Sequence, residues 1–245
     1  MKLVIEKSVT VITPTILSSK LSDAIESVQA QTYKNINHLI VVDGEEHKSK
    51  MPRLGIKNVK FMVLPYNTGA NGFYGHRIYA GLPHLINSDY IAFLDEDNWY
   101  EPNHIETLVN KLESNKLDWV YSLRKIYTKD KEFVADDCCE SLGRWPIFWS
   151  INKEPQYLVD TSAYLFKTSF LTQICNHWHS GWGGDRRFFH ILTKVLGHQN
   201  FDTTGQHTLC YRLDDSIEKK YGDISFFEKG NEVVKTHNRG KFPWL

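Results

Sequence analysis

The stretch Tyr90-Ile91-Ala92-Phe93-Leu94-Asp95-Glu96-Asp97-Asn98 joins a short apolar run directly to three acidic residues. The apolar run predicts a strand buried on both faces, and the carboxyl end of such a strand is where open α/β sheets bind ligands. Because side chains two residues apart point to the same side of an extended chain, Asp95 and Asp97 can reach one cation while Glu96 faces elsewhere. Oxygen ligands of this kind suit Mg²⁺, Mn²⁺ or Ca²⁺.

The same acids also fit a simpler interpretation, an acidic turn ahead of a helix. Pro102 suits a first helical turn, and either Asn98 or Glu101 can cap that helix without any metal. Apolar residues then follow at helical spacing: Ile105, Leu108, Val109 and Leu112. Both interpretations stay open on this stretch alone.

The composition is that of one folded domain spanning residues 1–245, since 41% of the residues are hydrophobic. The 29 basic and 29 acidic residues give a formal charge of zero. This balance offers no basic field for nucleic acid, and an anionic substrate has to be neutralised locally. No apolar run is long enough for a transmembrane segment, the first residues carry charges where a signal peptide needs apolar ones, and the four cysteines form no disulfide or metal spacing. We therefore expect a cytoplasmic protein.

Strand and helix patterns alternate through the first half of the chain. Strand patterns cover residues 9–13, 38–42, 59–64, 90–94 and 119–122, and helical patterns lie between most of them. This alternation predicts an α/β fold around a mostly parallel sheet. Pro83 should kink or shorten the helix that follows the loop 67–72.

The second half of the chain is less regular. Residues 125–157 mix charges with aromatic residues and predict an insertion or lid, whereas residues 164–166 predict one more strand. The flexible loop 180–185 precedes a helix with an apolar face. Beyond it the chain becomes polar, and we expect residues 213–245 to form an irregular, mobile tail.

Taken in order, these elements and motifs resemble the GT-A glycosyltransferases, and among them the inverting enzymes of family two. Val11-Ile12-Thr13-Pro14-Thr15 is similar to the family's first strand and turn, Ala30-Gln31-Thr32-Tyr33-Lys34-Asn35 to its S-Q-T-Y-x-N segment, and Val41-Val42-Asp43-Gly44 to its V-D-D element. Asp95-Glu96-Asp97 falls where the family has its D-x-D motif. The resemblance implies a GT-A (Rossmann-like) fold, with a nucleotide-sugar-binding half at about 8–122 and an acceptor-side half at about 123–212.

The resemblance also implies which residues bind the nucleotide sugar: Thr13, Pro14, Thr15, Asp43, Arg77, Asp95, Glu96 and Trp182. Asp43 would accept the imide N–H of uracil, with a turn aspartate as the alternative. Arg77 would offset diphosphate charge through its fork of donors, unless it is a solvated helix arginine. Trp182 would stack on a sugar, or only anchor its glycine-rich loop.

The implied cofactor is a divalent metal, Mn²⁺ or Mg²⁺, bound by Asp95 and Asp97. It would stabilise the negative charge that grows on the leaving diphosphate. A third ligand in this family is often a histidine beyond the helix that carries the base, and His207 is the best placed. The alternative for a lone histidine is a structural role.

Asp185 is the implied general base for the acceptor hydroxyl. Gly181-Trp182-Gly183-Gly184-Asp185 is similar to the G-W-G-G-E-D loop of related galactosyl- and N-acetylgalactosaminyl-transferases, and the family-two counterpart usually has a Glu-Asp pair. Here Arg186 and Arg187 follow, so the second acid is missing. Three roles stay open for Asp185: base, acceptor-binding acid, or N-cap of the next helix, where its pKa would fall.

The predicted function is a metal-dependent hexosyl- or N-acetylhexosaminyl-transferase that moves a sugar from a nucleotide sugar, first of all a UDP-sugar, to a carbohydrate or glycoconjugate acceptor with inversion. The alternatives are a non-catalytic relative that binds sugar nucleotides and a nucleotidyltransferase of similar fold, although residues 14–20 lack the glycine of the usual nucleotidyltransferase loop. A calcium module is disfavoured because Tyr100 stands where an EF-hand loop needs glycine.

Overall fold

The structure is a computed structural model that describes residues 6–51, 56–213 and 224–242. Its first half alternates strands and helices: β1 (Val9–Thr15), α1 (Leu21–Gln29), β2 (Ile36–Val42), β3 (Val59–Val63), α2 (His76–Gly81), β4 (Tyr90–Phe93) and α3 (His104–Ser114). β1 pairs in parallel with β2 and with β4, and β2 pairs in parallel with β3. The α/β alternation and the parallel pairing expected from the sequence are confirmed in this half.

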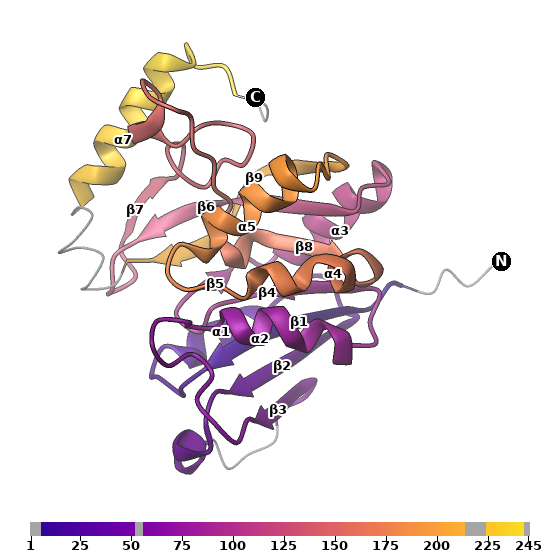
Figure 1. The fold of residues 1–245 in the computed structure, drawn as a ribbon. Coiled ribbons are helices and arrows are strands. Elements are labelled where there is room, and N and C mark those ends of the chain that lie inside the picture. Colours follow the sequence, from indigo (N-terminus) through magenta and orange to yellow (C-terminus); the bar gives the residue numbers. More distant parts are fainter. Residues whose placement is uncertain (1–5, 52–55, 214–223, 243–245) are drawn as a thin grey trace.

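The second half adds strands of mixed direction, β5 (Trp99–Tyr100), β6 (Trp119–Tyr127), β7 (Phe133–Asp136), β8 (Tyr164–Lys167) and β9 (Phe201–Arg212). It also adds the helices α4 (Thr168–Ile174), α5 (Gly184–His190) and α7 (Ile224–His237). β8 runs antiparallel to both β4 and β6, β5 runs antiparallel to β9, and β6 and β9 are parallel. The described strands form one mixed sheet in the order β3-β2-β1-β4-β8-β6-β9-β5, with β7 beside β6. Figure 1 shows how the two halves share this sheet.

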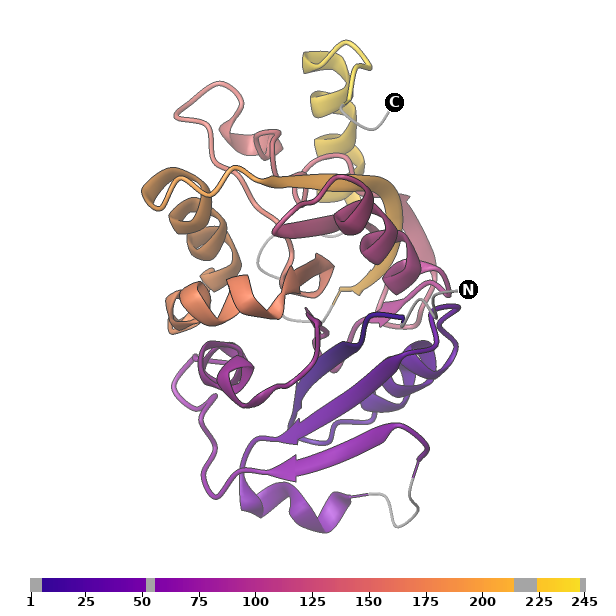
Figure 2. The same cartoon turned by 90° about the vertical axis from the view of Figure 1, so that its right-hand side faces the viewer.

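Helices cover both faces of the sheet. Figure 2 shows α1 and α3 on one side of it and α2, α4 and α5 on the other. Each helix turns an apolar stripe inward, as α1 does with Leu21, Ala24, Ile25 and Val28. α2 ends at Gly81, directly before Leu82 and Pro83 begin a tighter turn, so the expected shortening by proline is confirmed.

An aromatic cluster joins the helices of the second half to the sheet. Trp178 stacks on Phe188 of α5 with their ring centroids 4.2 Å apart, and Trp119 of β6 stacks on Phe201 of β9 at 3.9 Å. Both tryptophans are fully buried. Large aromatic contacts of this kind fix α5, and the loop that precedes it, against the sheet.

The end of the chain differs from the expected irregular tail. β9 occupies twelve residues up to Arg212, and α7 buries Phe227 and Val234. The prediction is therefore wrong for residues 224–237, while residues 214–223 and 243–245 lie outside the described chain. α7 packs against β7 and against a short turn at Phe148–Ser150, at the top of Figure 1.

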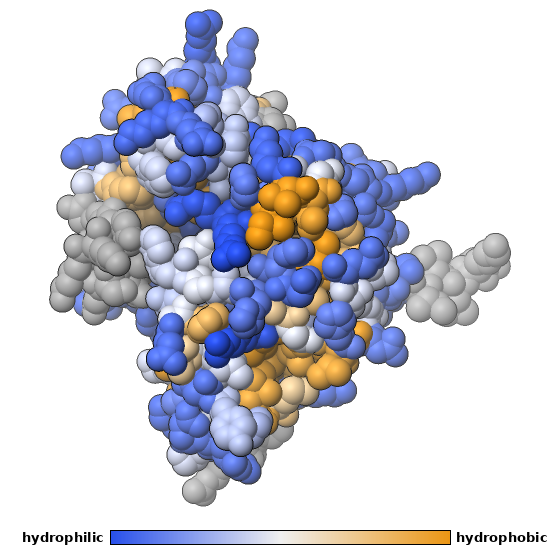
Figure 3. All heavy atoms as spheres, in the orientation of Figure 1, coloured by the Kyte–Doolittle hydropathy of each residue, from blue (hydrophilic) through white to orange (hydrophobic). Residues whose placement is uncertain are grey.

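The surface in Figure 3 is hydrophilic over most of its area. Apolar side chains gather on it over the end of α5, where Val195 and Leu196 are exposed. None of the described helices combines the length and the apolar character that crossing a membrane requires.

Gly230 tests the packing of α7. A Cβ at this position would lie 2.8 Å from Sγ of Cys139 and 2.8 Å from Cδ1 of Phe148. We expect Gly230→Ala to lower the free energy of unfolding by about 1–3 kcal/mol, because overpacking outweighs a gain in helix propensity of about 1 kcal/mol. The measurement is unfolding in urea.

Gly81→Ala is the matched control, since Gly81 is helical, exposed, and has no described atom within 4 Å of the added Cβ. That variant should be neutral or more stable by up to about 1 kcal/mol. Equal stabilisation of both variants would contradict the close contact of α7 with the domain.

Candidate functional site

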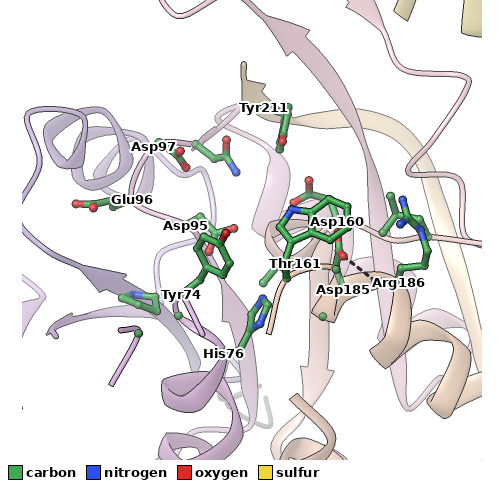
Figure 4. Close-up of a pocket in the computed structure, with 18 of the residues that line it drawn as sticks. Tyr74, His76, Asp95, Glu96, Asp97, Asp160, Thr161, Asp185, Arg186 and Tyr211 are labelled. Carbon is green, nitrogen blue, oxygen red and sulfur yellow. Dashed lines mark hydrogen bonds between the residues drawn. The ribbon is translucent and has the colours of Figure 1, made fainter. Parts of the chain in front are cut away.

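A pocket of about 1000 Å³ begins at the carboxyl ends of β1, β2 and β4 and extends into the second half of the chain. We call the part lined by residues 14–76 its N-terminal side, and the part lined by residues 124–227 its C-terminal side. Residues 95–98, which follow β4, lie between the two. Figure 4 shows Asp95 and Asp97 across the pocket from Asp160 and Asp185.

Asp95 is held in place by two hydroxyl groups. The Tyr79 hydroxyl donates a hydrogen bond of 2.7 Å to Oδ1 of Asp95, and Ser162 Oγ lies 3.4 Å from Oδ2. Burial, together with the nearby charges of Asp97 and Asp160, raises the pKa of Asp95 to about 8. A carboxyl group that resists ionisation in this way is one whose charge a bound cation would stabilise.

Glu96 points away from its two neighbours, as the alternation of an extended chain predicts (Figure 4). Its carboxylate accepts hydrogen bonds from Thr15 Oγ1 at 2.5 Å and from the Ser18 backbone N–H at 3.0 Å. Glu96 therefore shapes the turn after β1, next to Pro14 and Thr15, which also line the pocket.

Asp43 directly follows β2 and organises the loop after β3. Its Oδ1 accepts hydrogen bonds from the backbone N–H and the hydroxyl of Thr68, at 2.7 and 2.8 Å, and its Oδ2 accepts one from the Gly69 N–H at 2.7 Å. Asp43 thus lines the pocket and also acts as a structural aspartate. One lone pair of Oδ2 is left by these bonds, since each carboxylate oxygen can accept two.

Three residues expected at the site do not line it. Thr13 Oγ1 lies 2.9 Å from Nε2 of the buried His38, whose pKa burial lowers to about 3. The Arg77 guanidinium lies 3.5 Å from the centre of the Phe73 ring and donates to the Thr68 carbonyl at 3.1 Å. His76, the neighbour of Arg77, lines the pocket instead.

The third such residue is His207 of β9. Its Nε2 lies 3.2 Å from the backbone oxygen of Asp137, and it is absent from the described lining that contains Asp95 and Asp97. The structure therefore does not bring His207 to the acidic pair, and a role for it as a third metal ligand has no support from the geometry.

Asp185 is placed by two glycines that cannot be replaced easily. Gly183 is the N-cap of α5 with φ at +76°, and a Cβ on Gly184 would lie 2.5 Å from Cε1 of His76. Asp185 follows in the first turn, so its expected alternative role as the N-cap is wrong. Burial and the charge of Asp160 raise its pKa, the opposite of the fall expected for a cap.

A buried cluster around Arg124 was not predicted. Three nitrogens of its guanidinium each donate to a different carboxylate: Nε to Asp137 at 2.6 Å, one terminal nitrogen to Glu140 at 2.8 Å and the other to Asp160 at 2.8 Å. Arg124 is 3% exposed, so these bonds are shielded from water. The available signal was an arginine within a strand whose first five residues are mostly apolar, because a buried charge needs partners.

The cluster continues to the D-x-D segment. Asp160 accepts a hydrogen bond from the Ser162 N–H at 2.9 Å, and Ser162 Oγ accepts one from the Asp95 N–H at 3.0 Å. Arg124 is thus connected to Asp95 through Asp160 and Ser162. This chain of contacts links the two sides of the pocket.

Acidic residues outnumber basic ones in the described lining. It contains seven carboxylates, Asp43, Asp95, Glu96, Asp97, Glu140, Asp160 and Asp185, and two guanidinium groups, Arg124 and Arg186. No group of three or more His, Cys, Asp or Glu within the described ranges could hold a metal ion by itself. Asp95 and Asp97 nevertheless fit a Mg²⁺- or Mn²⁺-type cation, which commonly takes one or two carboxylates and completes its coordination with water and substrate phosphates.

A curled mixed sheet with a D-x-D segment at the end of a central strand defines a GT-A fold. The family model "Glycosyl transferase family 2" matches residues 10–153, more than half of the chain. The chain belongs to this family, and the resemblance drawn from its motifs is confirmed.

Curated relatives match only part of the chain. The glucosyl-dolichyl phosphate glucuronosyltransferase of Haloferax volcanii is 35% identical over 94 residues, which cover 38% of this chain and 29% of that protein. The glycosyltransferase GlyA of Streptococcus pneumoniae is 27% identical over 117 residues, or 47% of this chain and 16% of that protein. The matched stretches thus span less than a third of these relatives.

Solved structures match nearly the whole chain. S. aureus TarS 1-349 in complex with UDP-GlcNAc is similar with a TM-score of 0.61 at 13% identity, covering 94% of this chain and 66% of that one. The complex of TarS 1-349 with UDP gives a TM-score of 0.59 at 13% identity, with coverage of 95% and 72%. At this level of identity the likeness establishes the fold.

Arg124→Met tests the buried cluster. Without the guanidinium, Asp137, Glu140 and Asp160 face one another, and we expect a loss of about 3–5 kcal/mol in the free energy of unfolding near pH 7. The loss should shrink towards pH 5. In the variant the carboxyl pKa values rise above their unfolded values, so protonation on acidification relieves the repulsion.

Arg144→Met is the control for this experiment. Arg144 lies over the Phe201 ring at 4.2 Å and donates to the Phe201 carbonyl, and no ion pair to a carboxylate joins it among the described residues. Its loss of stability should be the same at pH 7 and pH 5 in urea unfolding. A pH-independent loss for Arg124→Met as well would contradict the proposed carboxylate repulsion.

Proposed function

We propose that this chain is a metal-dependent glycosyltransferase that uses a UDP-sugar and inverts the anomeric centre. The observation that carries the proposal is the presence of the acidic pair Asp95 and Asp97 in the same pocket as Asp185, a carboxyl group with a raised pKa. Family membership and the TarS structures with UDP and UDP-GlcNAc support the same assignment.

The donor occupies the N-terminal side of the pocket. Pro14 and Thr15 line its wall, and the remaining lone pair of Asp43 Oδ2 accepts the imide N–H of the base. Asp95 and Asp97 hold Mn²⁺ or Mg²⁺, which offsets the charge on the diphosphate. Trp182, 62% exposed on the C-terminal side of the pocket, stacks on the sugar of the donor.

The reaction is a single displacement. The acceptor oxygen forms a bond to the anomeric carbon while the bond from that carbon to the diphosphate oxygen breaks, and the electron pair leaves with UDP. The proton of the acceptor hydroxyl passes to the Asp185 carboxylate. Attack from the side opposite the leaving group gives inversion.

The division into a donor half at 8–122 and an acceptor half at 123–212, and the cytoplasmic location, stay predictions. The main competing function is binding of the sugar nucleotide without transfer of the sugar. A protein with that function would bind the donor as proposed but would show no turnover. A nucleotidyltransferase would differ by forming the sugar nucleotide from a nucleoside triphosphate.

Asp97→Ala tests the metal assignment. In titration calorimetry with UDP, Mn²⁺ should tighten binding to the unchanged chain, and this gain should fall by about 10–100-fold in the variant because one metal ligand is gone. Asp130→Ala, at an exposed turn, is the control and should keep the gain. UDP affinity that ignores Mn²⁺ in the unchanged chain would refute the metal site.

Asp185→Asn tests the base. The variant should bind UDP as tightly as the unchanged chain but lose about 10²–10⁴-fold in turnover. Since burial and Asp160 raise the pKa of Asp185, turnover of the unchanged chain should increase with pH through a range above that of an ordinary carboxyl group, because only the ionised form accepts the proton.

The measurement is the rate of UDP release by the unchanged chain and by Asp185→Asn, with and without added acceptor, over a series of pH values. Equal turnover in Asp185→Asn would leave Asp185 as a structural residue. Tight UDP binding without transfer by the unchanged chain would favour the non-catalytic alternative.

A further inference from the structure

The C-terminal side of the pocket carries an aromatic surface that the donor does not use. Trp149 lines it and is 39% exposed, and Tyr211, Phe226 and Phe227 line it as well. These side chains come from the turn 148–150, the end of β9 and the start of α7, and Asp185 lies on the same side. An acceptor must reach Asp185, so this surface is where it lies.

Trp149 is positioned by the packing of its neighbour Phe148 and by a contact of its ring with Arg186. Its neighbour Phe148 packs against Phe226 with ring centroids 4.7 Å apart, and Gly230 brings α7 to within contact of Phe148. On its other side, Cζ of Arg186 lies 5.5 Å from the centre of the Trp149 ring. A half-exposed indole held in this way loses little entropy when a ligand packs on it.

The charges on this side oppose an anionic ligand. Asp137, Glu140 and Asp160 share the single charge of Arg124, whose hydrogen bonds to them are already made. Asp185 adds a fourth carboxylate and Arg186 a second guanidinium, so acids exceed bases by two among the described residues of this side. Burial raises the pKa values of Glu140 and Asp185, and a neighbouring carboxylate adds to each rise, Asp137 for Glu140 and Asp160 for Asp185.

The hydrogen-bonding groups that remain suit hydroxyls. Within the described ranges Arg186 makes no ion pair, and its buried Nε has no hydrogen-bond partner. Carboxylates accept from sugar hydroxyls and a guanidinium donates to their oxygens. An aromatic side chain beside carboxylates and a guanidinium therefore suits a sugar ring, which has an apolar C–H face and hydroxyl groups at its edges.

Resting on the proposed transferase function, we infer that the acceptor is an uncharged sugar residue whose C–H face packs on Trp149 and whose hydroxyls bond to Asp160, Glu140 and Arg186. The acidic surroundings discriminate against uronic acids and sugar phosphates at this position, since like charges repel strongly where water is excluded. Trp149 thereby acts as a specificity-determining residue of the acceptor site, because it selects a ligand with an apolar face.

The test uses the full chain saturated with UDP and Mg²⁺, with binding of small sugars followed by saturation-transfer NMR. The probes are the methyl glycosides of glucose, galactose and N-acetylglucosamine, and as anionic counterparts methyl glucuronide and glucose 6-phosphate. At least one neutral glycoside should bind, and each anionic counterpart should bind at least about 10-fold more weakly.

Variants separate the role of Trp149 from general surface effects. Trp149→Ala should weaken the neutral glycoside by about 10-fold or more, and Trp149→Phe should retain part of the affinity. Phe133→Ala is the control, because Phe133 is a 57% exposed aromatic on β7 outside the pocket lining. UDP affinity should be unchanged in all three variants, which also reports that they fold.

Several results would overturn the inference. An anionic probe that binds more tightly than its neutral counterpart, with affinity lost in Arg186→Gln, would show that Arg186 recruits an anion. Unchanged glycoside binding in Trp149→Ala would remove the aromatic platform. If UDP binds but no neutral glycoside does, this inference fails alone, whereas failure to bind UDP overturns the transferase proposal and the inference with it.

Discussion

The hydrogen bonds of Arg124 to three carboxylates are the interaction on which the pocket depends. A guanidinium with two terminal nitrogens and Nε is one of the few groups that can hold three acids in fixed directions at once. Here it fixes Asp160, and Asp160 in turn reaches Asp95 through Ser162. The acceptor side and the D-x-D segment come from distant parts of the chain, and this chain of contacts sets their separation.

The same arrangement creates an excess of negative charge among the described residues of the pocket. The described lining of the pocket holds seven carboxylates and two guanidinium groups, although the whole chain has a formal charge of zero. Local charge therefore matters more than net charge. Burial raises the pKa values of Asp95 and Asp185, and nearby carboxylates add to both rises. The proposed function uses both: Asp95 gains from a bound cation, and Asp185 gains the affinity for protons that a base needs.

Periodicity in the sequence predicts most of the first half of the fold, because each element there repeats one simple pattern. Strand β4 is a continuous apolar run, β1 has Val9, Val11 and Ile12 among buried threonines, and α1 and α3 have clear apolar stripes. The later elements have weaker patterns. In α7 the buried positions Phe227, Gly230, Asn231 and Val234 do follow helical spacing, but polar residues and a glycine among them hide the stripe.

The sequence predicts a site residue where its place at the end of one strand brings it to the pocket. It does not predict which side chains of β9 face the pocket, because the pairing of β9 with β6 decides that. His207 and Tyr211 are four residues apart on β9, which in a regular strand would place them on one face. β6 pairs Leu123 with His207 but Arg124 with Leu209, so Thr208 is an extra residue and the faces exchange after it. Tyr211 accordingly reaches the pocket, where its ring lies 4.4 Å from Cζ of Arg124, and His207 does not.

Asp185 shows how the structure can resolve an ambiguity that a motif leaves. The second acid of the family's Glu-Asp pair is absent because Arg186 occupies the next position. Burial raises the pKa of Asp185, and the structure brings another carboxylate, Asp160, close enough to add to that rise. Two acids therefore meet in this pocket although only one lies in the loop, since Asp160 arrives from the segment before β8 and is held there by Arg124. This second acid lay beyond sequence reasoning, because its place depends on a buried ion pair between residues 36 positions apart in the chain.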